Sequence, residues 1–251
     1  MSIASEISRL QQAKSDLATS ITNKGVTVPA ATTLDGYAAL VDQIQTGGGL
    51  PQGAVEIEYL QSSGTQYINT GIPLNGYIRI ISDSQMLEVN VSAALFGVFL
   101  SNTRFGVRFN KSANNNNKLY LYYGSSSTYN EYLCTDYKGD SFYLNRCTYD
   151  YANNVSIAGN THTKGAGTGL VSFSSSQPIY SWACNANELD AGAFAPCKAR
   201  KWYEKIYING TLVRDYIPVR VGTVGYMYDK VSGELFGNAG TGSFILGNDI
   251  T

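Results

Sequence analysis

The feature that most constrains the fold is a change in the spacing of apolar residues around positions 46–53. Before this stretch, apolar residues recur every three or four positions, which is the period of an amphipathic helix. After it, short runs rich in aromatic and β-branched residues are bounded by Gly, Asn, Ser or Asp, as is typical of strands. Roughly a dozen such runs with no long helix among them favour a mainly β fold, a two-sheet antiparallel sandwich preceded by a small helical module.

The stretch itself, TGGGLPQG, contains four glycines and no periodic apolar pattern. Such a composition is typical of a flexible linker between independently folded parts. The predicted organisation is a helical module at residues 1–45, a linker at 46–53 and a β domain at 54–251. Within the β domain, Asn209 and Gly210 predict a tight hairpin turn, because both residue types accept the positive φ that it needs. A second turn is predicted at Ser232 and Gly233.

The first predicted helix carries an apolar stripe with heptad spacing. A short helix with several Ser and Thr residues is marginal in water, so the stripe is expected to be buried by association with copies of the same chain. The alternative is that the helix packs on its own chain. A second helix is predicted after Thr33 as the N-cap, with Leu34, Tyr37, Leu40, Val41 and Ile44 as its apolar face. The predicted oligomerisation residues are Ile3, Ile7, Leu10, Leu17 and Ile21.

Composition argues against several functions. Charged residues make up 15% of the chain, its net charge is -1, and no cluster of Lys and Arg stands out, so nucleic acid is not an expected partner. There is no apolar run long enough for a membrane-spanning helix and no signal-peptide pattern, which predicts synthesis in a cytoplasm without membrane insertion. The cysteines lack the CxxC spacing of zinc or redox sites and are predicted to be buried free thiols. They are Cys134, Cys147, Cys184 and Cys197.

No catalytic residue is predicted. His162 is the single histidine, in a stretch that reads as a loop, and the hydrolase, metalloprotease and P-loop motifs are missing. A glycosidase is the enzyme alternative, because Glu56 and Glu58 have the i, i+2 relation that places two carboxylates on one face of a strand. The chain is nevertheless predicted not to be an enzyme.

Several loops combine Tyr with Ser, Gly and Asn, which is the usual composition of binding loops. Sugars suit such loops, because their hydroxyls need amide or carboxylate partners and their C–H faces can lie on a phenol ring. Trp182 and Trp202 lie in apolar strand patterns, so both are predicted to be core residues. The predicted ligand-binding residues are Tyr123, Tyr129, Asn130, Tyr132 and Asp136.

Two segments, LVRDYIPVRVGTVGYMYDKVSGELF at 212–236 and EYLQSSGTQYINT at 58–70, resemble the two ends of a known module. It is the concanavalin A-like (laminin G-type) jelly roll common in phage and prophage tail proteins. Residues 7–44 are similar to a short N-terminal module of tail-fibre proteins that serves attachment or oligomerisation. The resemblance is weakest at 102–169.

The resemblance implies a jelly-roll receptor-binding protein of a phage tail, located in the virion and made in a bacterial cytoplasm. Its implied partners are a bacterial surface glycan, other tail proteins and two further copies of itself in a trimer. The alternative is a purely structural tail component that binds nothing on the host. No cofactor is predicted; laminin G relatives often hold calcium, yet no Asp-rich loop here demands it, so calcium stays open.

Overall fold

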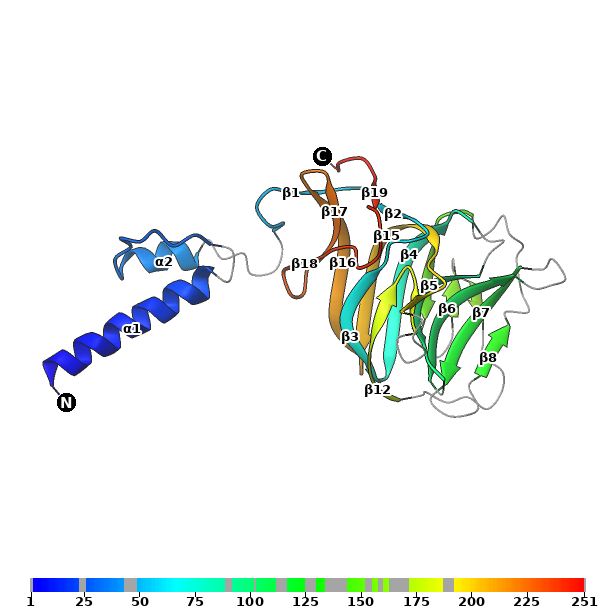
Figure 1. Ribbon diagram of the computed structural model, residues 1–251, viewed down its shortest axis with the longest axis horizontal. Helices are drawn as coiled ribbons and strands as arrows, with labels where there is room; N and C mark the ends of the chain where they lie inside the picture. The colour runs from blue at the N-terminus through cyan, green and yellow to red at the C-terminus, as the bar shows by residue number, and fades with distance from the viewer. Residues whose placement is uncertain are drawn as a thin grey trace. The chain divides into compact units, whose positions relative to one another are not determined.

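The protein is described by a computed structural model that covers residues 2–22, 26–42, 49–88, 92–101, 103–111, 117–124, 130–133, 144–151, 155–157, 160–162, 172–186 and 192–250. The chain divides into two compact units, Met1–Gln52 and Gly53–Thr251 (Figure 1). The first unit is helical and the second is built from strands, so the predicted mainly β fold with a small N-terminal helical part is confirmed.

The helical unit consists of α1 (Ile3–Thr22) and α2 (Gly36–Val41). Its small core is formed by Ile21, Val26 and Tyr37, which are buried against one another. The predicted N-cap at Thr33 is wrong, because residues 33–37 form successive i to i+3 turns and α2 begins only after Asp35.

The predicted apolar face of α2 is correspondingly reduced. Tyr37 is its buried residue, whereas Leu34 and Val41 are exposed. Ile44 lies outside the described residues.

The second unit, which we call the head, contains two sheets. The described strands of the larger sheet follow the order β11-β10-β9-β4-β15-β16-β17-β18, with β1 beside β16 and with β2 pairing both β15 and β19. All its pairs are antiparallel. Its strands are β1 (Ala54–Glu56), β2 (Leu60–Ser63), β4 (Ile78–Met86), β9 (Cys147–Tyr151), β10 (Val155–Ile157), β11 (Asn160–His162), β15 (Lys198–Ile208), β16 (Thr211–Val221), β17 (Val224–Asp229), β18 (Glu234–Phe236) and β19 (Ile245–Leu246).

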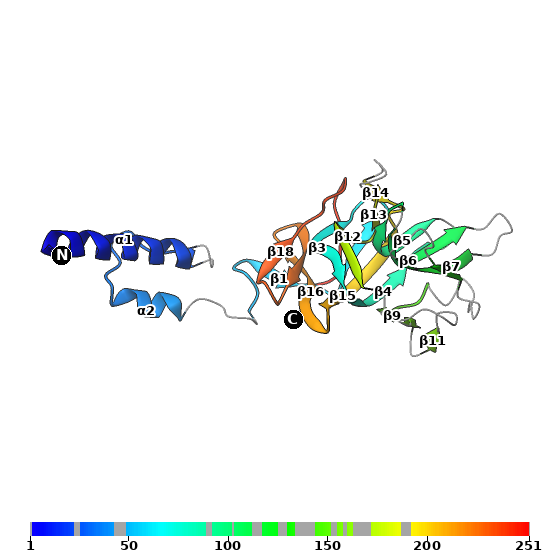
Figure 2. The same cartoon turned by 90° about the horizontal axis from the view of Figure 1, so that it is seen from below.

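The smaller sheet follows the order β14-β13-β5-β6-β7-β8, and β12 joins it by pairing with both β5 and β3. Its one parallel pair among the described strands is β13 with β5. Figure 2 shows β9 and β11 on one side of the head and β13 and β14 on the opposite side. The strands are β3 (Ile68–Gly76), β5 (Ala93–Phe99), β6 (Arg104–Lys111), β7 (Asn117–Gly124), β8 (Asn130–Leu133), β12 (Phe173–Ser181), β13 (Cys184–Asn185) and β14 (Ala193–Phe194).

One hydrophobic core draws side chains from both sheets, which makes the head sandwich-like. Trp182 is fully buried in it, as predicted, and donates its ring N–H to the carbonyl of Ala199 at 3.0 Å. The predicted hairpin turn is also confirmed, since Asn209 and Gly210 have φ of 50° and 82° between β15 and β16. Gly233, in the second predicted turn between β17 and β18, has φ of 75°.

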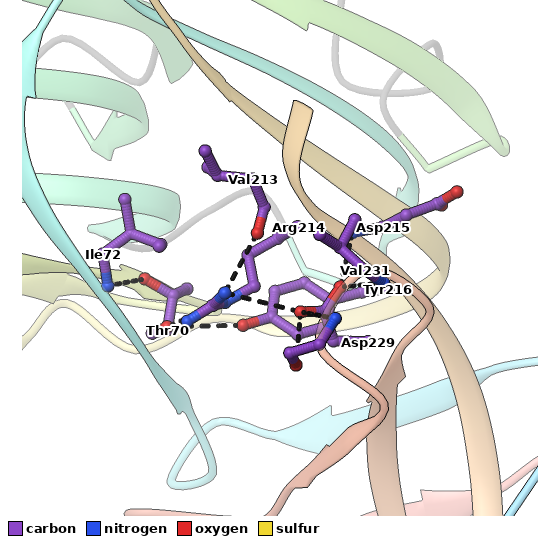
Figure 3. A network of polar contacts seen from close by, with 9 residues as sticks. Thr70, Ile72, Val213, Arg214, Asp215, Tyr216, Asp229 and Val231 are labelled. Atoms are coloured by element: carbon purple, nitrogen blue, oxygen red, sulfur yellow. Dashed lines mark hydrogen bonds and ion pairs between the residues drawn. The ribbon is translucent and has the colours of Figure 1, made fainter. Parts of the chain in front are cut away.

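A network around buried Asp229 fixes the turn after β17 (Figure 3). Its carboxylate accepts hydrogen bonds from the backbone N–H of Asp215 at 2.8 Å and of Val231 at 3.1 Å. It also accepts the hydroxyl of Ser232 at 2.7 Å and pairs with Arg214 at 3.4 Å. The Asp229 carboxylate therefore accepts hydrogen bonds from donors at the turn, where strand pairing provides no backbone acceptor.

Arg214 extends this network to the other sheet. It donates from Nε to the carbonyl of Thr70 on β3 at 3.3 Å, and the hydroxyl of Tyr216 approaches the same carbonyl at 3.5 Å (Figure 3). Burial raises the pKa of the Tyr216 phenol, which keeps it protonated as a donor. The Arg-Asp-Tyr segment at 214–216 therefore has a structural role.

The central strand β15 carries a buried ion pair. Lys201 and Glu204 are both fully buried, and the ammonium of Lys201 donates to the Glu204 carboxylate and, at 2.6 Å, to the hydroxyl of Ser181. The ammonium also lies 4.8 Å from the ring centre of Trp182 and 5.5 Å from that of Phe96. These contacts offset part of the cost of removing two charges from water.

The two inward residues are three positions apart, which a regular strand does not allow, because side chains alternate between its faces. The register between β15 and β4 shifts here, from Lys201 opposite Ser84 to Tyr203 opposite Asp83. Trp202 is therefore the extra residue of a β-bulge. Ala199 and Lys201 face the core before the bulge, and Glu204 and Ile206 do so after it.

Removing one member of the buried pair should lower the free energy of unfolding much more than removing both. We expect Lys201→Met to lower the free energy of unfolding by about 3–5 kcal/mol, because it leaves the Glu204 carboxylate buried and unpaired. The double variant Lys201→Met/Glu204→Leu should recover most of that loss. Denaturant unfolding of the three proteins measures this, and a double variant no more stable than the single one would contradict it.

Three cysteines, Cys147, Cys184 and Cys197, are buried free thiols as predicted, and Cys134 lies outside the described residues. Burial raises the pKa of Cys184 and of Cys197 to about 12. At pH 8 such a thiol is ionised in only about one molecule in 10,000.

Iodoacetamide should therefore spare Cys184 and Cys197 in the folded protein and modify both in concentrated guanidinium chloride. Peptide mapping by mass spectrometry checks this, and fast labelling of either thiol in the folded state would contradict it.

Candidate functional site on the outer face of the larger sheet

The outer side of β15 carries only cationic and aromatic side chains. Residues 199, 201, 204 and 206 face the core, so the remaining positions between 198 and 207 face outward. The bulge at Trp202 lets two neighbouring rings share this side. We call this surface the β15 face. Its strand residues are Lys198, Arg200, Trp202, Tyr203, Lys205 and Tyr207.

Trp202 stands at the centre of the β15 face, half-buried, so its prediction as a core residue is wrong. The bulge explains the error, because regular alternation counted back from Glu204 and Ile206 would place this position in the core. On one side the ring of Tyr59 lies 5.5 Å from the Trp202 ring, centre to centre, at an interplanar angle of 59°. On the other side the guanidinium of Arg146 lies 4.3 Å from the ring centre.

Arg146 is held over Trp202 by an aspartate on β4. It donates to Asp83 from Nη2 to Oδ2 at 2.7 Å and from Nε to Oδ1 at 3.1 Å, a two-point contact that fixes the guanidinium plane. The hydrogen bond with Asp83 raises the pKa of Arg146. Asp83 is buried beneath this contact, whereas the Arg146 side chain is 53% exposed. The Arg146 guanidinium is thus accessible to a ligand and held in a fixed position.

Arg200 occupies the equivalent place over Tyr59. Its guanidinium carbon lies 4.5 Å from the ring centre, and its Nε donates to the side-chain carbonyl of Gln61 at 2.8 Å. Tyr59 and Gln61 come from the segment around β2, which pairs with β15 directly. Two neighbouring rings with a guanidinium group at each end therefore form one row, Arg200, Tyr59, Trp202 and Arg146.

Other ion pairs surround this row. Lys198 contacts Glu88 at 2.7 Å, and Arg79 contacts Asp150 at 2.6 Å beside Tyr207. Lys205 and Lys230 share the carboxylate of Asp215 at 3.6 and 3.5 Å. The named contacts thus involve six cationic side chains and four carboxylates. Folding thus brings together cationic side chains for which the sequence predicted no cluster.

Three of the five predicted ligand-binding residues lie on strands of the smaller sheet. The register places Tyr123 of β7 opposite Asn130 of β8, and Leu121 opposite Tyr132. On its other side Tyr123 pairs with Phe105, whose side chain is in the core. Tyr129 and Asp136 lie outside the described residues. A ligand-binding role for all five remains a prediction.

A second arginine–aromatic cluster lies on the smaller sheet. Phe99 and Phe194 stack at 4.9 Å and 22°, with Arg104 4.0 Å above Phe99 and Arg108 4.6 Å above Phe194. The two rings cover each other, and Arg108 is only 9% exposed. Because Arg108 is nearly buried whereas the Arg146 side chain is exposed, we favour the β15 face.

Glu56, Glu58 and His162, the residues considered for catalysis, lie on or next to short strands. Glu56 ends β1, and Glu58 accepts a hydrogen bond from the amide of Asn248 at 3.1 Å. His162 ends β11 and does not lie in the predicted loop. Within the part of the chain that the structure describes, no group of three or more His, Cys, Asp or Glu side chains is placed to hold a metal ion. Among the same residues, no helix has the length and apolarity required to cross a membrane.

No protein-family model matches the chain, and no curated protein is significantly similar to it. The site must therefore be judged from its residues. Its signal was present in the sequence, since KARKWYEKIY at 198–207 holds four cations and three aromatic residues in ten positions. Alternation alone did not show which of them face outward.

Proposed function

We propose that the chain is a receptor-binding component of a phage or prophage tail that recognises a bacterial cell-surface glycan and catalyses no reaction. The observation that carries this proposal is the half-buried pair Trp202 and Tyr59, set between two arginines on the β15 face. The binding surface would be this face, and the loops that hold Tyr129 and Asp136 remain a second candidate region.

A sugar matches the chemistry of the β15 face. The C–H face of a pyranose ring is apolar and can lie on the indole or phenol, while its hydroxyls require hydrogen-bond partners beside the rings. Arg146, Arg200 and Gln61 provide donors and an acceptor at this place. Because these side chains stand on strands or next to them and are held by an ion pair or by one another, little order has to be gained on binding.

For the fold we propose the concanavalin A-like jelly roll. Two sheets with a shared core support it, and so does the structural role of Arg214 and Asp229 within the segment that resembles the end of that module. The resemblance also supports the tail as the place where the protein works, in the virion, after synthesis in a bacterial cytoplasm.

The helical unit supports self-association. Four of the five predicted oligomerisation residues are exposed, namely Ile3 by 83%, Leu10 by 53%, Ile7 by 51% and Leu17 by 38%. Ile21 instead packs inside its own unit, which is the alternative considered from the sequence. We propose a trimer, in which several weak glycan sites act together and gain effective concentration. Other tail proteins would be the further partners.

Replacing Trp202 should abolish glycan recognition. On an array of bacterial surface polysaccharides, we expect the full chain to bind and Trp202→Ala to bind about tenfold or more weakly, because the central stacking surface is lost. Tyr77→Ala is the matched control, since Tyr77 is an exposed aromatic residue that takes no part in the β15 face, and it should bind normally. No signal on any polysaccharide, together with stable capture of another tail protein, would favour the purely structural role. Release of reducing sugar, abolished by Glu56→Gln or Glu58→Gln, would favour the glycosidase.

The exposed stripe of α1 should set the oligomeric state. Light scattering of the full chain at micromolar concentration should give the mass of a trimer, and Ile7→Asp/Leu10→Asp should give a monomer, because charge on the stripe prevents its burial. Leu34→Asp, at a residue that is 59% exposed and outside the stripe, should leave the trimer intact. A monomeric native chain would reject this assembly.

A further inference from the structure

We propose that the glycan bound by the β15 face is acidic, and that Arg200 takes the carboxylate of one sugar residue while its ring lies on Trp202 and Tyr59. This inference rests on the proposed glycan-binding function and names its ligand class. It follows from the way in which Arg200 differs from three other arginines of the head.

Three arginines of the head hold an aspartate with two parallel hydrogen bonds. Arg79 does so with Asp150 at 2.8 and 2.6 Å. Arg146 does so with Asp83 at 3.1 and 2.7 Å, and Arg220 does so with Asp249 at 2.7 and 2.6 Å. In each case Nε and Nη2 form the fork that fits a carboxylate.

Arg200 has no such partner among the described residues. Its Nε donates to Gln61, a neutral acceptor, and neither Nη group donates to any described residue. No described carboxylate forms an ion pair with it, in contrast to Lys198 two positions earlier on the same strand, which pairs with Glu88. Arg200 therefore retains both Nη groups and a full positive charge for a ligand.

The position of this charge defines the ligand. The guanidinium lies 4.5 Å from the centre of the Tyr59 ring, and that ring lies 5.5 Å from the Trp202 ring. A ligand that contacts both the Arg200 guanidinium and the two aromatic rings carries a carboxylate directly beside an apolar ring face. A uronic acid, or another sugar acid with its carboxylate on the ring, has this arrangement.

The carboxylates around the β15 face narrow the class of glycan further. Asp83, Asp150, Asp215 and Glu88 lie among the cations of the β15 face, so a polymer with a phosphate on every unit meets repulsion as well as attraction. A polysaccharide with one acidic sugar per repeat places its charge at Arg200 and neutral sugars elsewhere. A polyol phosphate also lacks the sugar-ring face in its backbone that would cover Trp202.

The test compares each polysaccharide with its own carboxyl-reduced form, in which the acid becomes a primary alcohol and the backbone is unchanged. Bacterial capsular polysaccharides that contain uronic acid are printed in both forms beside neutral capsular polysaccharides and a ribitol-phosphate polymer. We expect the full chain to bind at least one native form about tenfold or more tightly than its reduced form. Arg200→Gln should remove this difference, and Arg200→Lys should restore it only in part, because an ammonium makes a single-point contact. Arg220→Gln, which removes the same charge from an exposed arginine that is already paired, should behave as the native chain.

The outcomes separate the two proposals. Equal binding of native and reduced forms by both the native chain and Arg200→Gln, with loss of binding in Trp202→Ala, overturns acid selectivity and leaves glycan recognition in place. Stronger binding of the ribitol-phosphate polymer than of every uronic acid polysaccharide also overturns it. Absence of binding to every acidic and neutral polysaccharide overturns both proposals. Thermal melting of each variant shows whether it is folded.

Discussion

The buried contact between Lys201 and Glu204 constrains both the core and the surface of the head. Two charges in an apolar core are tolerated only with close partners, which here are each other, Ser181 and the ring of Trp182. Because the two residues lie three positions apart and both face inward, the strand must carry an extra residue between them. That residue is Trp202, so a constraint of the core places the largest aromatic side chain of the strand on the solvent side.

The segment at 212–236, which resembles the end of a known module, is explained by structure and not by binding. Arg214, Tyr216 and Asp229 join β16 and the turn after β17 to Thr70 on the opposite sheet. The surface proposed for recognition combines β15 with side chains from β4, the segment around β2 and the residue before β9. A fold can keep the first set as its scaffold while the second set changes with the ligand.

Much of the fold was predictable from local patterns. The glycine-rich break, the strand runs, the turn at Asn209 and Gly210 and the burial of Trp182 all follow from the chemistry of neighbouring residues. The site was not predictable in this way. Trp202 faces outward only because of the bulge, and Arg146, Tyr59 and Asp83 reach it through strand pairings between distant parts of the sequence. The loops that hold Tyr129 and Asp136 remain a prediction.

A crystal structure of the full chain soaked with a uronic acid oligosaccharide tests the central claim most directly. The β15 face predicts a sugar ring packed on Trp202 and Tyr59, with its carboxylate on the two Nη groups of Arg200 and with the ion pair of Arg146 and Asp83 intact. An oligosaccharide bound instead at β7 and β8 of the smaller sheet, with the β15 face empty, would contradict it.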